Sequence, residues 1–253
     1  MAEKILIIGD TIIDKDINLE AIGLSLESPT IKTSYINDKI NFGGAANVAK
    51  YASHFGADIT FMTCMSKNSE VQFLKDNNIS LLNLDNNIEN TKSRFYVKHG
   101  NERYKYLQIN NTNKKKLDLD INLDLNKYDT IAFSDYRCGL VSQNMIKKSL
   151  MSAATTYGAS QISSQQSNFA DYLDMDFLVC NEKEASTFSR RENVVITKGE
   201  EGCTLNNIKY PTEIIASPQN LIGAGDCFYA AYLVFKNPKK ANRYAADYIN
   251  GKI

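Results

Sequence analysis

Several residues and patterns that often reveal a protein's function are scarce in this sequence. Only two histidines occur in its 253 residues, His54 and His99; neither has clustered ligand residues nearby, and neither is assigned a catalytic role. The cysteines are odd in number, widely spaced and form no Cys-x-x-Cys pair, which predicts free thiols in a reducing compartment. They are Cys64, Cys138, Cys180, Cys203 and Cys227, the last of which begins a helical pattern and is expected to be a packing thiol.

Net charge and long apolar runs are also lacking. The chain has 29 Lys plus Arg and 29 Asp plus Glu, so its formal net charge is zero and bulk charge attracts neither nucleic acid nor a membrane surface. No stretch has 18 consecutive apolar residues, and the N-terminus passes directly into a strand pattern. We therefore expect no membrane partner, no signal peptide and a cytoplasmic location.

A dinucleotide fingerprint is missing where it would be expected. The first strand ends in Ile8-Gly9-Asp10-Thr11 rather than in Gly-x-Gly-x-x-Gly. This argues against a dinucleotide-dependent oxidoreductase.

What the chain does contain is a series of short apolar runs that alternate with helical patterns. Such alternation predicts a mainly parallel sheet covered by helices on both faces, within one large α/β domain over residues 1–253. The predicted strands are Lys4–Gly9, Asp58–Thr63, 128–134, 157–162, 177–180 and 193–197, and helical spacing covers 45–55 and 142–157.

Two regions depart from this alternation. Strand-like runs over 92–98 and 103–109 surround His99-Gly100-Asn101-Glu102, which is typical of a hairpin, and 30–42 is polar and β-prone. Together they predict a small antiparallel sheet that projects from the domain, with segments at about 12–42 and 90–110. The alternative is a surface hairpin without a function.

The most informative segment is Gly223-Ala224-Gly225-Asp226, directly before an apolar helical run. The unpaired N–H groups at a helix start favour an anion, and glycine lets the backbone approach it closely. A carboxylate at that position can accept a proton, so the segment suits phosphoryl transfer. The alternative is an ordinary Gly-Ala-Gly turn with Asp at a helix start.

Three further segments support the first interpretation. They are Gly43-Gly44-Ala45-Ala46-Asn47, Asn181-Glu182-Lys183-Glu184 and Thr197-Lys198-Gly199-Glu200-Glu201-Gly202. In this order, the four segments resemble those of the PfkB (ribokinase-like) family of carbohydrate kinases. The segments Asp135-Tyr136-Arg137-Cys138-Gly139 and Ser25-Leu26-Glu27-Ser28-Pro29 most resemble D-glycero-β-D-manno-heptose-7-phosphate kinases, including the kinase half of the bifunctional ADP-heptose synthesis enzyme.

The resemblance implies a ribokinase-like fold with a β-lid over the sugar and a homodimer formed through that lid. It implies transfer of the γ-phosphoryl group of ATP to a sugar or sugar phosphate, with the anomeric hydroxyl of a heptose 7-phosphate as the expected acceptor. Asp226 would be the general base, and the amides of Gly223, Ala224 and Gly225 would stabilise the transferring group.

The resemblance also assigns binding residues. Substrate contacts would come from Asp10, Asp14, Gly43, Gly44, Asn47, Asp135 and Arg137, the last of which replaces the usual lysine and has a planar fork suited to a phosphate. Arg94 and Arg103 are secondary candidates for that phosphate. Nucleotide and Mg²⁺ would be held by Asn181, Glu184 (the metal through water), Thr197, Gly199, Gly202 and Asn242.

Some positions depart from the family pattern. Asn220-Leu221-Ile222 replaces an Asp-Thr approach to the glycines, residues 163–168 lack an acidic residue and lysine, and the tail after Asp226 is short. Two alternatives therefore remain: a PfkB kinase for another sugar or a nucleoside, and a non-catalytic sugar- or nucleotide-binding protein. Retention of Asp226 argues against the second, since a binding protein needs no base.

Overall fold

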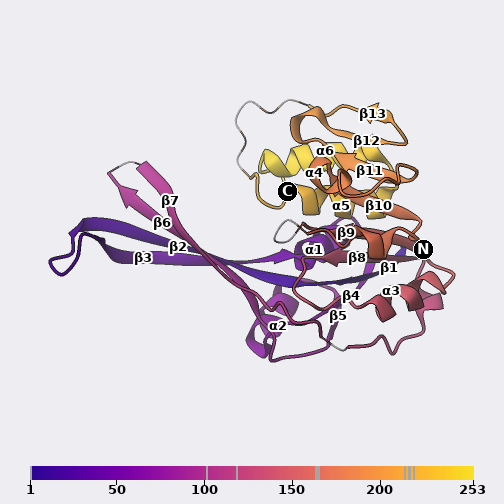
Figure 1. Cartoon of the computed structure of the whole chain (residues 1–253), viewed down its shortest axis with the longest axis horizontal. Coiled ribbons are helices and arrows are strands. Elements are labelled where there is room, and N and C mark those ends of the chain that lie inside the picture. Colours follow the sequence, from indigo (N-terminus) through magenta and orange to yellow (C-terminus); the bar gives the residue numbers. More distant parts are fainter. Residues whose placement is uncertain are drawn as a thin grey trace.

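The computed structural model describes residues 2–100, 102–117, 119–162, 166–213, 215, 218 and 220–253. The chain forms a body built on a nine-stranded sheet and a four-stranded sheet that projects from it (Figure 1). We call the projecting sheet the lid.

The body sheet has the strand order β13-β12-β11-β10-β9-β8-β1-β4-β5. The pairings from β11 across to β5 are parallel, and β12 and β13 add an antiparallel edge. Because the carboxyl ends of parallel strands meet at one edge, polar residues that follow these strands are brought together. The strands are β1 Lys4–Gly9, β4 Asp58–Thr63, β5 Ser80–Asn83, β8 Thr130–Asp135, β9 Thr155–Ser160, β10 Phe177–Asn181, β11 Val194–Thr197, β12 Cys203–Leu205 and β13 Ile208–Tyr210.

Alternating side chains of the central strand β1 enter two separate cores. Ile5 and Ile7 pack with α1 (Ala45–His54), α5 (Ala224–Phe235) and α6 (Pro238–Ile249). Leu6 and Ile8 pack on the opposite face with α3 (Gln143–Leu150) and the 3-10 turn Phe169–Tyr172. This is why residues 5–8 of the strand are all apolar, instead of every second one.

The remaining helices are shorter or peripheral: α2 Lys67–Asp76, α4 Glu182–Ala185, and the 3-10 turns Leu125–Lys127 and Gly199–Glu201. No helix within the described residues is both long enough and apolar enough to cross a membrane. All five cysteines are free and buried, as expected. Cys227 is on α5 and points into the core, where burial raises the pKa of its thiol to about 12.

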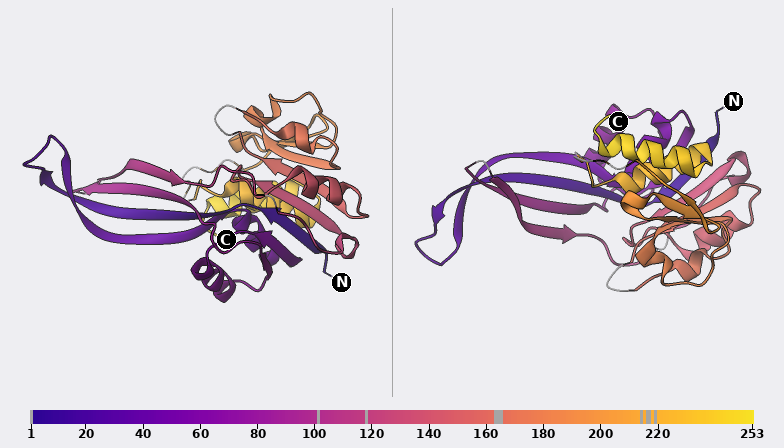
Figure 2. Two further views of the ribbon diagram at one scale, coloured as in Figure 1. Left: turned by 60° about the horizontal axis from the view of Figure 1, so that its bottom comes forward. Right: turned by 90° about the horizontal axis from the view of Figure 1, so that it is seen from above.

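The lid consists of β2 Thr11–Leu24, β3 Ile31–Gly44, β6 Asn90–His99 and β7 Glu102–Asn111, in the order β3-β2-β6-β7. It extends away from the body in every view (Figures 1 and 2). The projecting sheet predicted from the sequence is confirmed. Both hairpins are antiparallel, and β2 and β6 join them through a parallel pairing that the sequence did not reveal.

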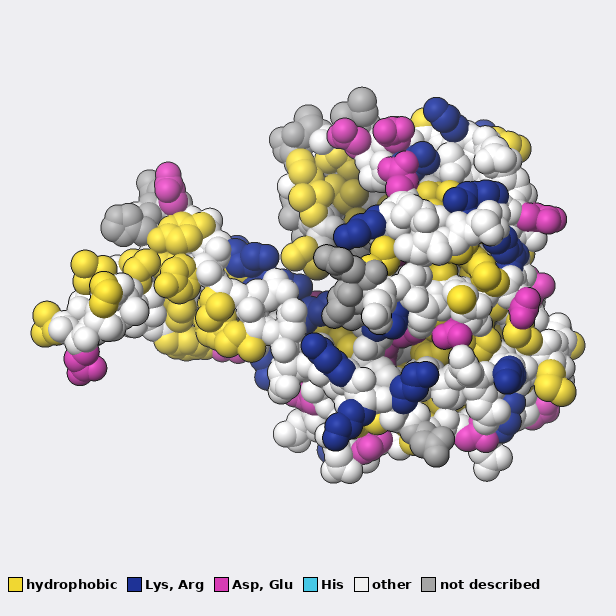
Figure 3. Space-filling view, viewed as in Figure 1, with side chains coloured by type: hydrophobic (Ala, Val, Ile, Leu, Met, Phe, Trp, Pro, Cys, Tyr) yellow, Lys and Arg dark blue, Asp and Glu magenta, His cyan; other side chains and the backbone are white. Residues whose placement is uncertain are grey.

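The two faces of the lid differ in polarity, as the residues that lie opposite one another on its strands show. One register row joins Asp16 to Lys39 and Arg94, and the neighbouring row joins Ile17 to Phe95, which in turn lies opposite Leu107. The polar lid face contains Asp14, Asp16, Asn18, Lys39, Lys92 and Arg94. The opposite face, which we call the apolar lid face although it also contains Lys15, Asp38 and Ser93, contains Ile17, Leu19, Tyr35, Ile40, Phe95, Val97, Tyr104, Leu107 and Ile109. Hydrophobic side chains gather over much of the lid in Figure 3.

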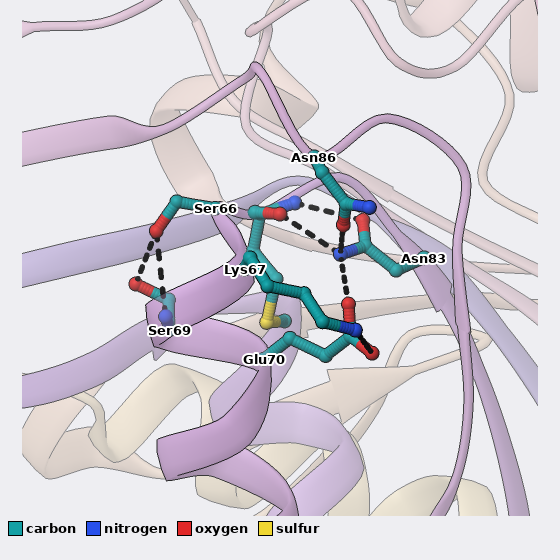
Figure 4. Close-up of polar contacts among 7 residues, drawn as sticks. Ser66, Lys67, Ser69, Glu70, Asn83 and Asn86 are labelled. Atoms are coloured by element: carbon teal, nitrogen blue, oxygen red, sulfur yellow. Dashed lines mark hydrogen bonds and ion pairs between the residues drawn. The ribbon is translucent and has the colours of Figure 1, made fainter.

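Hydrogen bonds fix the chain that leads into the lid. Asn83, at the end of β5, donates to the carbonyl of Met65 (2.8 Å) and to Glu70 of α2 (2.8 Å), next to the N-cap Ser66 (Figure 4). At the first residue of β6, the Asn90 side chain donates to the Thr11 carbonyl (3.3 Å). The two hairpins are thereby joined where they leave the body.

The strands Lys4–Gly9 and Asp58–Thr63 have the predicted bounds, but the predicted helix over 142–157 is wrong in its second half. The helix ends at Leu150, and Thr155–Ser160 form β9. Thr155 and Thr156 are β-branched, and a side chain at Gly158 would come within 3.0 Å of Tyr172 and Met175. The spacing of apolar residues did not reveal this close approach.

Candidate active site

The loop into α5 has the geometry predicted for an anion site. Gly223 is the N-cap with φ of 94°, a conformation that favours glycine, and a Cβ there would lie 2.9 Å from the Tyr248 hydroxyl. Ala224 and Gly225 begin the helix, and Asp226 lies in its first turn. The leading amides of such a helix have no partner within the helix, so they are available to an anion.

Two donors from different elements hold the Asp226 carboxylate. Asn47, in the first turn of α1, donates to Oδ2 (3.3 Å), and the Tyr136 hydroxyl, from the loop after β8, donates to Oδ1. Removal from water raises the pKa of Asp226 to about 6, although both hydrogen bonds lower it. A carboxylate with this pKa is ionised at neutral pH and is still basic enough to take a proton.

Three hollows meet at this helix start. The lid pocket (about 270 Å³) lies between lid and body and includes Asp14, Gly44, Asn47, Lys92 and Arg94. The central pocket (about 150 Å³) includes Asp135, Asn181, Glu184 and Thr197, and the α6 pocket (about 350 Å³) includes Gly199, Gly202, Asn242 and Ile249. Gly225 lines all three, and Asp226 lines the lid and central pockets.

The lid pocket combines acceptor and donor groups. Asp14 pairs with Arg94 (2.9 Å), and burial raises the pKa of Asp14 in spite of that neighbour. A Cβ at Gly43 would lie 2.4 Å from Asp14 Oδ2 and would displace that carboxylate, while Gly44 has φ of 66°, a conformation that favours glycine. The pocket can therefore bind a ligand with several hydroxyl groups.

Asp10 has a different place from the one expected. It is buried, and its carboxylate accepts the backbone amides of Tyr136 (3.0 Å), Cys138 (3.1 Å) and Leu140 (3.3 Å). Burial, followed by the charge of Asp135, raises its pKa to about 7. Asp10 therefore positions the loop after β8, and its contact with substrate stays a prediction.

Asp135 and Arg137, in the same loop, also make mainly internal contacts. Asp135 accepts from Asn168 (2.7 Å) and from Tyr172 (2.8 Å), while it still lines the central pocket. Arg137 has a left-handed φ of 62° and donates to the Gln166 carbonyl (3.2 Å). It is not among the described residues that line the lid pocket, and its contact with the phosphate of a substrate stays a prediction.

Asn181 and Glu184 form a capping box at the start of α4. Glu184 N donates to Asn181 Oδ1, and Asn181 N donates to Glu184 Oε2, both at 2.9 Å. Burial raises the pKa of Glu184. In the part of the chain that the structure describes, no three acidic, His or Cys side chains cluster as a metal cage. Asn181 and Glu184 supply side-chain oxygens beside the central pocket. Two such side chains suit a metal ion that is held through water better than they suit an ion that is enclosed entirely by protein ligands.

The α6 pocket collects the remaining predicted nucleotide residues. Thr197 lines both this pocket and the central one, and Gly199 and Gly202 lie on its wall. Gly202 has φ of 89°, and a Cβ there would lie 2.2 Å from the Tyr210 carbonyl. Asn242 lines the same pocket but is mostly buried and donates to that carbonyl (2.7 Å).

Sequence reasoning did not assign a role to Tyr136 or to Lys92. Tyr136 is the second residue of Asp135-Tyr136-Arg137-Cys138-Gly139, the segment that resembles heptose kinases. That position is the one signal in the sequence that could have indicated a role for it. Lys92 is on β6, and its ammonium lies 5.6 Å from the centre of the Tyr136 ring. Of residues 163–168, which depart from the family pattern, 163–165 lie outside the described residues.

The sequence matches the family described as pfkB family carbohydrate kinase over residues 2–236. The chain belongs to this family. Its fold is the ribokinase fold, and the family that it belongs to is one of carbohydrate kinases.

Curated relatives of this PfkB chain include the bifunctional protein HldE of Campylobacter jejuni strain RM1221, with 23% identity over 290 residues, 96% of this chain and 60% of the relative. HldE of Rhodopseudomonas palustris strain BisB5 is 25% identical over 269 residues, which cover 91% of this chain and 55% of that protein. The chain thus spans about three-fifths of the length of these relatives.

Solved structures with the same fold include the nucleoside kinase of Methanocaldococcus jannaschii, with a TM-score of 0.66, 17% identity, and coverage of 96% of this chain and 89% of that one. Phosphofructokinase-2 from Escherichia coli, in complex with fructose-6-phosphate, has a TM-score of 0.66 and 15% identity, over 97% of this chain and 91% of that one.

Proposed function

We propose that this PfkB kinase transfers the γ-phosphoryl group of ATP to a sugar phosphate, with the anomeric hydroxyl of a heptose 7-phosphate as the acceptor and Asp226 as the base. The observation that supports this most directly is the position of Asp226, which lines both the lid pocket and the central pocket. A phosphoryl group that passes from one pocket to the other passes this carboxylate.

In this mechanism the acceptor sugar lies in the lid pocket against Asp14 and Asn47. Its hydroxyl oxygen forms the new bond to phosphorus while the bond to ADP breaks, and Asp226 takes the hydroxyl proton. The amides of Ala224, Gly225 and Asp226 stabilise charge on the transferring group from the helix start. Mg²⁺, bound with ATP near Glu184 through water, would neutralise phosphate charge.

The phosphate carried by the acceptor needs cations away from Asp226. A wide groove of about 830 Å³ continues from the lid pocket, with which it shares Asp14, Asn47 and Arg94, and it adds Lys39 and Lys50. Lys39 and Arg94 both lie opposite Asp16 in the register of the lid. These three cations, together with the resemblance of residues 135–139 to heptose kinases and the HldE relatives, support a sugar phosphate over a free sugar.

The proposed base is tested by Asp226→Asn, which keeps the size of the side chain but removes proton acceptance. ATP turnover should be measured with a panel of heptose 7-phosphates, hexose phosphates, free sugars and nucleosides. Turnover with the best acceptor should fall by about 10²–10⁴, while nucleotide binding is kept. Unchanged turnover would eliminate Asp226 as the base, and no turnover by the wild type with any acceptor would favour a binding protein.

The acceptor's phosphate is tested by the double variant Lys39→Ala/Lys50→Ala. KM should rise about tenfold or more for sugar phosphates and little for free sugars, since a charge-assisted contact contributes roughly 1.5 kcal/mol or more. Lys32→Ala/Lys75→Ala removes two exposed lysines outside the groove and is the matched control. Equal losses for both substrate classes would show that these lysines do not bind the phosphate.

A further inference from the structure

We propose that Tyr136 is a positioning residue for the reaction: its phenol holds the Asp226 carboxylate in one orientation and favours its ionised form. This inference rests on the proposed role of Asp226 as the base. Tyr136 lines both the lid pocket and the central pocket, where phosphoryl transfer would occur.

Tyr136 is itself held firmly from behind. Its backbone amide donates to buried Asp10 (3.0 Å), as does the amide of Cys138 two residues later (3.1 Å). Between them, Arg137 adopts its left-handed conformation and its amide donates to Asp135 Oδ1 (2.7 Å). The buried aspartates at the ends of β1 and β8 therefore hold the turn that directs the phenol at Asp226.

The carboxylate is held at both oxygens by donors on separate elements. Tyr136 donates to Oδ1 from the loop after β8, and Asn47 donates to Oδ2 from α1. Each carboxylate oxygen can accept more than one hydrogen bond, so the substrate hydroxyl can still approach. With both oxygens engaged, rotation of the carboxylate is restricted before substrate arrives.

Other groups also face Asp226. Asp14 of β2 raises its pKa and Lys92 of β6 lowers it, after the larger effects of burial and of the hydrogen bonds. Tyr51 of α1 and Tyr248 of α6 lie nearby, and burial raises the pKa of both phenols, so they stay neutral; Cys227 follows in the same helix. Among the interactions that lower the pKa of Asp226, the hydrogen bond from Tyr136 is the largest.

The test is Tyr136→Phe, which removes the hydroxyl and keeps the ring. Loss of a hydrogen bond to the charged form should raise the pKa of Asp226 by about one unit. The pKa is read from the pH dependence of the carboxyl ¹³C shift in protein labelled at aspartate carboxyl carbons, with the Asp226 signal assigned by its loss in Asp226→Asn. Since the base acts when ionised, the acid limb of kcat/KM should move to higher pH by the same amount.

Tyr35→Phe is the matched control. It removes a phenol that donates to a different carboxylate, Asp38, on an exposed part of the lid, and should leave the Asp226 titration in place. If Tyr136→Phe does not fold, 3,5-difluorotyrosine at 136 keeps the ring and should lower the pKa through a stronger donor. An unchanged Asp226 titration in the folded Tyr136 variant would overturn the inference.

The carboxyl titration and the activity assay separate the two proposals. A raised pKa in Tyr136→Phe together with full turnover in Asp226→Asn would refute the base and leave the contact intact. An inactive Asp226→Asn with an unmoved titration in Tyr136→Phe would refute only the role of Tyr136.

Discussion

Arg137 shows how the conformation of one residue can redirect its side chain. Arg137 has a left-handed φ of 62° and lies between Tyr136 and Cys138, whose backbone amides both donate to Asp10. Its guanidinium donates to the Gln166 carbonyl. The sequence placed a cation after a central strand, where phosphate binding was a reasonable expectation. The direction of the side chain depends on the turn, and the turn depends on an aspartate more than 120 residues earlier in the chain.

Substitution of Arg137 distinguishes a turn residue from a phosphate ligand. Arg137→Gly should be more stable than Arg137→Ala by about 1 kcal/mol, because glycine adopts a positive φ without strain. Both variants should keep the wild-type ratio of activity on sugar phosphates to activity on free sugars. Urea unfolding and the acceptor panel provide the two measurements; a selective loss of sugar phosphates in Arg137→Ala would restore the predicted phosphate contact.

The two faces of the lid differ in what they contact: the polar lid face lines the lid pocket, and the apolar lid face is exposed. The polar lid face supplies Asp14, Lys92 and Arg94 to the lid pocket, and the apolar lid face exposes Tyr35, Ile40, Leu107 and other large side chains. An apolar surface of this kind commonly marks an interaction site. We propose that a second copy of the chain covers it, as the family resemblance implies.

Leu107→Lys tests the proposed homodimer. Leu107 is 46% exposed on the apolar lid face, and a charge there should weaken self-association at least tenfold. Gln108→Lys is the control, because neighbouring strand residues point to opposite faces. Light scattering at micromolar concentration should show a dimer for the wild type and the control and a smaller mass for Leu107→Lys. A monomeric wild type would contradict the proposal.

Elements with strong local patterns were predictable, and those defined by distant contacts were not. The strands Lys4–Gly9 and Asp58–Thr63 are short, mostly apolar and mostly buried runs, so their bounds follow from the local sequence. The glycines at 43, 44, 223 and 225 likewise marked two helix starts that meet at Asp226. The hydrogen bond from Tyr136 to Asp226 joins residues 90 positions apart, and no local pattern predicts such a contact.

The stability of the whole molecule depends on pH because burial destabilises the charged forms of two carboxylates near the site, Asp10 and Asp226. The pKa of Asp10 is raised to about 7 and that of Asp226 to about 6, from 3.8 in both cases. A raised carboxyl pKa means that the folded state binds a proton more tightly than the unfolded state. The stability that this binding contributes is present below about pH 4 and is lost as the pH rises through 6 and 7.

Asp226→Asn should therefore stabilise the fold at pH 8, where the wild type has a charged, partly buried carboxylate. We expect a gain of about 1 kcal/mol, which for a chain of this size raises Tm by about 2–4 °C. The gain should shrink at pH 5, where the wild-type group is mostly protonated. Thermal unfolding at both pH values measures it, and Asp174→Asn, at an exposed position, should show neither effect.

The alternation of side chains along the lid also makes the protein sensitive to the parity of insertions and deletions. One residue added to β2 before Asp14 would reverse the direction of every side chain beyond it, because the pleat repeats every two residues. Asp14, Asp16 and their partner cations would then be separated, and Ile17 and Leu19 would lie on the face of the lid pocket. Two added residues would restore the alternation. Relatives with lids of different length should therefore differ there by even numbers of residues, unless a β-bulge absorbs the odd one.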